Sequence, residues 1–236
     1  MNSKERRLHR RVSGIIAENS RIVFADGLQL VPINISYGGF AVSLPQEKHD
    51  EIWKNQEPLE IHFKTLAKGV AAHAKPVRRE GSITAFAIEY NSIEALMFLR
   101  GIFEHWQNGA TARAIDNERT NQEDNEKIFI NGEGPFDIVI TNFHKNPLPD
   151  VLVTFLSEGE YYQVDFLNST LRTGKTKASG ATKLPGAIMN MDAKLNTEAL
   201  REAICILAGI ELAAYKEPID SILQNWVKQL VATSQA

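Results

Sequence analysis

The sequence predicts two domains: an N-terminal all-β antiparallel barrel with a C-terminal helix, and a second domain of the α+β class. Three observations lead to this prediction. Short apolar alternations broken by turns fill residues 12–91, a stripe with helical spacing follows them, and further strand and helix patterns come after a polar stretch.

The first strand patterns show a period of two, clearest in Ile61-His62-Phe63. Good turn formers separate them at Asp26-Gly27, Gly38-Gly39, Lys68-Gly69 and Glu80-Gly81. Many short strands with such punctuation are typical of a closed antiparallel barrel. We predict strands at 21–25, 28–35, 40–44, 59–66, 70–78 and 83–90.

A helix is predicted over 92–106. Ser92 is a suitable N-cap, and Leu96, Leu99, Phe103 and Trp106 recur at helical spacing, which would bury one stripe. The first domain is therefore expected to end near residue 108.

Residues 109–127 are rich in Asn, Asp, Glu and Thr and are predicted to be a polar linker. A second domain is expected at 128–236, with strands at 136–141, 151–156 and 161–167 and a Gly/Lys/Thr-rich loop at 173–186. Two helices should follow, one at 197–215 and one that opens with Pro218. This half of the sequence resembles no family that we can name, so its role stays open.

The composition is that of an ordinary globular protein, with 43% hydrophobic and 23% charged residues among 236. The formal net charge of −3 gives no overall field that favours nucleic acid. No apolar run reaches the length of a membrane span. The basic N-terminus is not followed by the apolar segment of a secretory signal, so we expect a cytoplasmic protein. The single cysteine, Cys205, excludes an intramolecular disulfide and lies in an apolar run, so it is interpreted as a core residue.

Two short motifs near the start predict the binding of an anionic ligand. The first is the run Arg6-Arg7-Leu8-His9-Arg10-Arg11, and the second is Asn34-Ile35-Ser36-Tyr37-Gly38-Gly39. Arginines are permanently charged, forked donors that suit phosphate oxygens and the O6/N7 edge of guanine. The second motif supplies short polar side chains and a backbone that a ligand can approach closely.

Together the two motifs resemble the PilZ family of cyclic di-GMP receptors, which carry an RxxxR segment followed by a [D/N]xSxxG segment. The resemblance covers about residues 4–107. Asn34, Ser36 and Gly39 match the second segment, with Gly38 in the same turn, and both Arg6/Arg10 and Arg7/Arg11 match the first. The Arg7/Arg11 alignment is favoured, because the family's second arginine usually precedes an apolar residue that opens the barrel, here Val12.

The resemblance implies a non-enzymatic receptor in which the arginines, Asn34, Ser36 and the two glycines bind cyclic di-GMP, without a metal or another cofactor. Binding would change the surface offered to the second domain or to a protein partner and so regulate motility, adhesion or biofilm formation. Two alternatives stay open: a PilZ-like adaptor that binds protein without nucleotide, and an enzyme in residues 128–236 regulated by the barrel. A homodimer is also compatible with the sequence.

Other motifs are weaker. Gly174-Lys175-Thr176 lacks the preceding glycine of a phosphate-binding loop, since residue 169 is Ser, and no helix pattern follows it directly. Arg78 and Arg79 end a predicted strand; they could add positive potential near the barrel mouth, but they are interpreted as exposed strand-end charges. No catalytic set and no metal-ligand spacing stands out, and His105, His144 and Asp150 cannot be linked from sequence alone.

Overall fold

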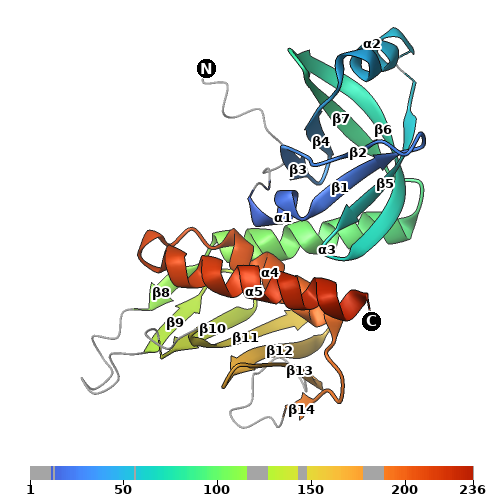
Figure 1. The fold of residues 1–236 in the computed structure, drawn as a ribbon. Coiled ribbons are helices and arrows are strands. Elements are labelled where there is room, and N and C mark those ends of the chain that lie inside the picture. Colours follow the sequence, from blue (N-terminus) through green and yellow to red (C-terminus); the bar gives the residue numbers. More distant parts are fainter. Residues whose placement is uncertain are drawn as a thin grey trace. The chain divides into compact units, whose positions relative to one another are not determined.

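The computed structural model describes residues 12, 14–55, 57–115, 127–142, 148–177 and 189–235 (Figure 1). The chain divides into two compact units, with the division between Phe103 and Glu104. This boundary falls inside helix α3 (Ile93–Ala110), a few residues before the predicted domain end. No helix of the described residues is both long and apolar enough to cross a membrane.

The first unit is built on an antiparallel sheet. Its hydrogen-bonded order is β2 (Gln29–Leu30), β1 (Ser20–Phe24), β5 (Leu59–Thr65), β6 (Lys68–Glu80), β7 (Ile83–Glu89), β4 (Gly39–Ser43) and β3 (Asn34–Ser36). The short helix α1 (Ile15–Glu18) precedes β1. One face of the sheet carries the core, in which Phe40 and Phe86 stack with ring centroids 5.1 Å apart.

The closed barrel predicted from the sequence is wrong, because β2 and β3 end the sheet without pairing to each other. The expected strand at 28–35 contains Pro32, which has no N–H to donate, and the run splits there into β2 and β3. Only residues 31–33 join the two edges, so the Cα atoms of Leu30 and Asn34 lie at most about 15 Å apart. The sheet therefore curls until its edges approach, but its hydrogen-bond ladder stays open.

Helix α2 (Gln46–Asn55) interrupts a region that was predicted to contain only strands and turns. It buries His49 and Ile52, and Trp53 Nε1 donates to Thr84 Oγ1 over 3.2 Å. Its apolar stripe is too short to stand out from the polar residues around it, which explains why the sequence did not reveal it.

Helix α3 confirms the predicted helix and extends it by one turn. The Ser92 hydroxyl caps it by accepting from Ala95 N over 3.1 Å. Ala95, Leu99, Ile102 and Phe103 form the buried stripe of its first part.

The second unit confirms the predicted α+β class. Its sheet is an antiparallel meander in chain order: β8 (Arg113–Ile115), β9 (Lys127–Asn131), β10 (Phe136–Thr141), β11 (Asp150–Ser157), β12 (Glu160–Leu167), β13 (Thr170–Lys177) and β14 (Asn190–Met191). Helices α4 (Thr197–Gly209) and α5 (Lys216–Ser234) lie over one face of the sheet and are joined through the 3₁₀ turn η2 (Ala213–Tyr215) (Figure 1).

Several details of this unit differ from the sequence prediction. The helix expected at 197–215 ends at Gly209, and a 3₁₀ turn covers Ala213–Tyr215. Strand β9 was not predicted. Arg113–Ile115, within the expected linker, pairs with β9 as strand β8. The first part of the expected loop at 173–186 belongs to β13, which pairs with β12 along its whole length, and residues 178–188 lie outside the described ones. Thr and Lys suit an exposed strand as well as a loop, so their enrichment did not discriminate between the two.

Candidate functional site

The predicted site residues divide into two groups. Arg6, Arg7, Arg10 and Arg11 lie outside the described residues. Asn34, Ser36, Gly38 and Gly39 are described and form the β3–β4 hairpin, in which Ser36 pairs with Gly39 across Tyr37 and Gly38.

The residue that follows the arginines is fixed to this hairpin. Val12 pairs antiparallel with Ile35: Val12 N donates to Ile35 O over 2.7 Å, and Ile35 N donates to Val12 O over 3.0 Å. Both side chains are buried. Because Arg11 is covalently bonded to Val12, the arginine motif is attached to the chain at the strand that carries Asn34 and Ser36.

Contacts within the hairpin hold its turn in place. Ser36 Oγ donates to Gly39 O over 3.1 Å, and Ile88 N donates to Gly38 O over 3.0 Å. Gly39 has no room for a side chain, because a Cβ atom there would lie 2.0 Å from Phe86 O. The motif's glycine is thus required by the close approach of β4 to β7.

Tyr90 is a further residue of this region that the motifs did not indicate. Its hydroxyl donates to Tyr37 O, and the two rings lie 5.6 Å apart. Burial, reinforced by the nearby Tyr37, raises the pKa of Tyr90 above its ordinary value. Tyr90 therefore keeps its proton and acts as a donor that fixes the turn.

Asn34 and Ser36 lie on the face of the sheet opposite to the core. They flank Ile35, which is buried, and both are half-buried themselves. The residues that lie opposite Asn34 and Ser36 on the neighbouring strands form two rows across the sheet. From β3 to β6, the first row is Asn34, Ala41, Ala85 and Arg78, and the second is Ser36, Gly39, Ala87 and Lys75.

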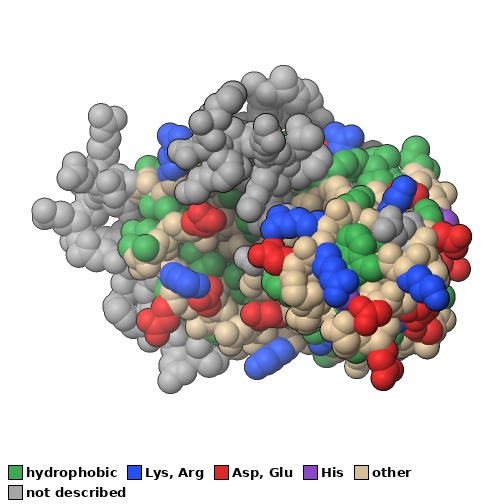
Figure 2. All heavy atoms as spheres, turned by 90° about the horizontal axis from the view of Figure 1, so that it is seen from above, with side chains coloured by type: hydrophobic (Ala, Val, Ile, Leu, Met, Phe, Trp, Pro, Cys, Tyr) green, Lys and Arg blue, Asp and Glu red, His purple; other side chains and the backbone are tan. Residues whose placement is uncertain are grey.

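This outer face combines small side chains with polar and basic ones. Gly39 and Ala41 are buried, Ala85 and Ala87 are half-buried, and Lys75 and Arg78 are exposed. The exposed cationic donors at the rim of this face suit a ligand that carries negative charge. On the face drawn in Figure 2, basic and acidic side chains are interspersed.

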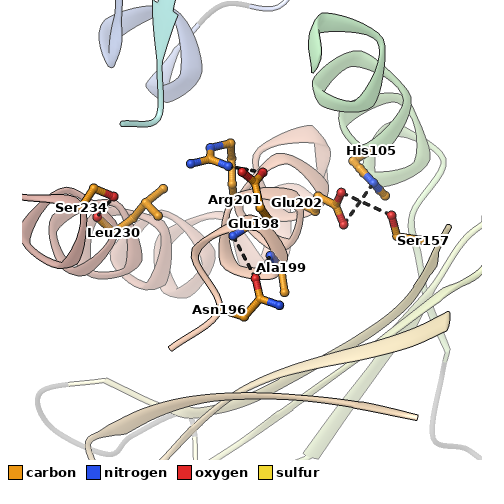
Figure 3. A network of polar contacts seen from close by, with 9 residues as sticks. All are labelled: His105, Ser157, Asn196, Glu198, Ala199, Arg201, Glu202, Leu230 and Ser234. Carbon is orange, nitrogen blue, oxygen red and sulfur yellow. Dashed lines mark hydrogen bonds and ion pairs between the residues drawn. The ribbon is translucent and has the colours of Figure 1, made fainter. Parts of the chain in front are cut away.

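The second unit holds a polar network that bears on the enzyme alternative (Figure 3). Ser157 Oγ donates to Glu202 Oε1 over 3.3 Å, and His105 Nε2 lies 3.6 Å from Glu202 Oε2. A nucleophilic serine needs the histidine beside its hydroxyl, with the carboxylate behind the histidine. Here the carboxylate lies between the two, so the order does not suit activation of Ser157.

The neighbouring contacts in this view are structural. Asn196 Oδ1 caps α4 by accepting from Glu198 N and Ala199 N, each over 3.1 Å, and Arg201 pairs with Glu198 (Figure 3). Asp150 accepts from Asn142 Nδ2 over 2.7 Å and from Asn168 N over 3.0 Å, whereas His144 lies outside the described residues.

Other motifs of the second unit also have structural explanations. Gly174, Lys175 and Thr176 lie inside β13, where Lys175 pairs with Glu160 over 2.9 Å, so they do not form a phosphate-binding loop. Cys205 is buried, and burial raises the pKa of its thiol to about 12. Within the described residues, no group of three or more His, Cys, Asp or Glu is placed to hold a metal ion.

Comparison with known proteins adds no relative. No protein-family model matches the chain, and no curated protein is similar to it.

Proposed function

We propose that the chain is a receptor for cyclic di-GMP that binds the dinucleotide through the arginine motif and the outer face of the β3–β4 hairpin. The observation that carries this proposal is the pairing of Val12 with Ile35. Val12 directly follows Arg11, so the last arginine of the motif is one peptide bond away from the residue that pairs with the strand of Asn34 and Ser36. This link between two motifs separated by about two dozen residues supports the proposal.

The chemistry of these groups suits the ligand. Cyclic di-GMP offers two phosphates and two guanines. Arginine bonds phosphate bidentately and reads the O6/N7 edge of guanine, and a second guanidinium can lie over the face of the base. Asn34 can bond a base edge, and the Ser36 hydroxyl, which donates to Gly39 O, can still accept a hydrogen bond.

The output is proposed to be a change in the surface offered to the second unit or to a protein partner, with regulation of motility, adhesion or biofilm formation as the consequence. Helix α3 continues without interruption through the boundary between the two units. Its first part buries Leu99 and Ile102 in the first unit, and its last part buries His105 and Gly109 in the second. We propose that a change at the ligand site reaches the second unit through this helix.

Calorimetric titration with cyclic di-GMP, GTP and cyclic di-AMP tests the proposal. We expect selective binding of cyclic di-GMP by the unaltered chain and a loss of about one to two decades in affinity for each arginine contact removed, as in Arg7→Ala/Arg11→Ala. Arg113→Ala is the control, because its side chain is 77% exposed and lies in the second unit. Absence of cyclic di-GMP binding at high micromolar concentration would overturn the proposal.

A protein-binding adaptor remains the second candidate, favoured by one observation. Ile93 and Met97 are one helical turn apart on α3 and are 78% and 55% exposed. Exposed apolar side chains at this spacing are typical of a surface that docks on a partner. If nucleotide binding is absent, capture of a partner that is lost in Ile93→Ser/Met97→Ser would support the adaptor.

A further inference from the structure

Strand β6 contains an irregularity that changes which side chains reach the outer face. Its pairing with β7 shifts between Pro76 and Arg78, so Val77 is an extra, bulged residue. Lys75 pairs with Ala87 and Arg78 with Ala85. Because Ala85 and Ala87 are two positions apart on β7, Lys75 and Arg78 lie on the same face, although they are three positions apart in the sequence.

We infer that Lys75 and Arg78 form a second, cationic rim of the ligand site at β6, across the outer face from a first rim that Asn34 and Ser36 form at β3. This inference rests on the proposed function and names residues that the motifs do not include. Lys75 continues the row of Ser36, and Arg78 continues the row of Asn34. Each polar residue of the hairpin thus faces a cation at the far end of its own row.

The spacing of the two rims selects the class of ligand. Three steps between neighbouring strands separate β3 from β6, which places their backbones about 14 Å apart. A single phosphate cannot bond both rims at once, whereas a dinucleotide with two phosphates can extend across the floor between them. That floor consists of Gly39, Ala41, Ala85 and Ala87, none of which carries a side chain larger than a methyl group.

The charges around the rim leave both cations able to bond a ligand. Within the described residues Lys75 has no ion-pair partner, and Arg78 Nη2 lies 2.5 Å from Glu80 Oε2. That pair is 62% and 70% exposed, so it contributes at most a small stabilisation and a phosphate can replace the carboxylate. In the next row His73 pairs with Glu89 on one side and with Glu60 on the other, so two further acids lie on this part of the face.

The test is a titration of the full chain with cyclic di-GMP at low and at high salt. For Lys75→Ala/Arg78→Ala we expect affinity to fall about 10- to 100-fold, and the deficit to shrink at high salt because the lost contacts are ionic. Glu80→Gln should increase affinity, since it frees Arg78. The charge-matched control is Arg113→Ala/Lys216→Ala, two exposed cations of the second unit, and should bind like the unaltered chain.

The outcomes separate this inference from the proposed function. If the unaltered chain binds cyclic di-GMP and the Lys75→Ala/Arg78→Ala variant binds equally well, the second rim is overturned and the receptor stands. If the unaltered chain does not bind, both fail. Equal melting temperatures for the variants and the unaltered chain will show that any loss of binding is not a loss of folding.

Discussion

The carbonyl oxygen of Phe86 occupies the place that a side chain on Gly39 would need, because a Cβ atom there would lie 2.0 Å from it. Gly39→Ala must therefore separate β4 from β7. We expect the free energy of unfolding to fall by about 1–3 kcal/mol, measured by urea denaturation.

Gly101→Ala is the matched control for this substitution. Gly101 lies inside α3, and no atom comes within 4 Å of a Cβ built there. Alanine favours helix over glycine, so this variant should gain up to about 1 kcal/mol. Equal stability of the two variants would contradict the close contact at Gly39.

The second prediction concerns pH. The raised pKa of Tyr90 means that the folded state holds this proton more tightly than the unfolded state does. The associated stability is complete below the ordinary tyrosine pKa of about 10 and is lost as pH rises above it. Urea denaturation between pH 8 and 11 should show the free energy of unfolding falling as pH rises. This fall should be smaller in Tyr90→Phe.

Ultraviolet titration gives a second readout for Tyr90. We expect the curve of the unaltered chain to contain a tyrosine that ionises well above the ordinary tyrosine pKa, and this component to be absent from the Tyr90→Phe curve. A curve that Tyr90→Phe leaves unchanged in this range would contradict the assignment.

A third prediction concerns the sheet of the second unit. Arg172 bonds Asp165 bidentately, with Nε to Oδ1 at 2.9 Å and Nη2 to Oδ2 at 3.2 Å, and the Asp165 side chain is only 1% exposed. Arg172→Met would leave this carboxylate with Gln163 as its other side-chain donor. Because Arg172 is itself 47% exposed, we expect a loss of about 1–3 kcal/mol, below that of a fully buried pair.

Lys175→Met is the control for that pair. Lys175 bonds Glu160 on the same two strands, but both partners are in contact with solvent, so its loss should cost less than about 1 kcal/mol. Chemical denaturation of both variants makes the comparison. Equal losses would show that burial of Asp165 does not decide the strength of the interaction.

Most strands and the three long helices were predictable because their apolar residues repeat with the right period. The regular alternation of β5 and β7 and the stripe of α3 are examples. Whether the sheet closes into a barrel was not predictable in this way. Alternation of apolar residues describes each strand, but it does not show whether the two edge strands pair with each other. Pro32 was the available signal, since it cannot donate to a ladder.

The candidate site was predicted only in part. Asn34, Ser36 and Gly39 stood out as a motif, whereas Lys75 did not and Arg78 was interpreted as an exposed strand-end charge. Strict alternation along β6 would place Arg78 on the face opposite to Lys75. The bulge at Val77 instead places Arg78 on the same face as Lys75. Tyr90 was hidden for a different reason: its partner is a backbone oxygen of a turn far away in the sequence.

The pairing of Val12 with Ile35 also protects the molecule from association. Strand β3 is an edge of its sheet, and an edge with free N–H and C=O groups is a template on which another chain can add a strand. Val12 forms hydrogen bonds with both the N–H and the C=O group of Ile35. A truncated chain that starts after Val12 would expose this edge, so loss of the first residues should favour aggregation through β3.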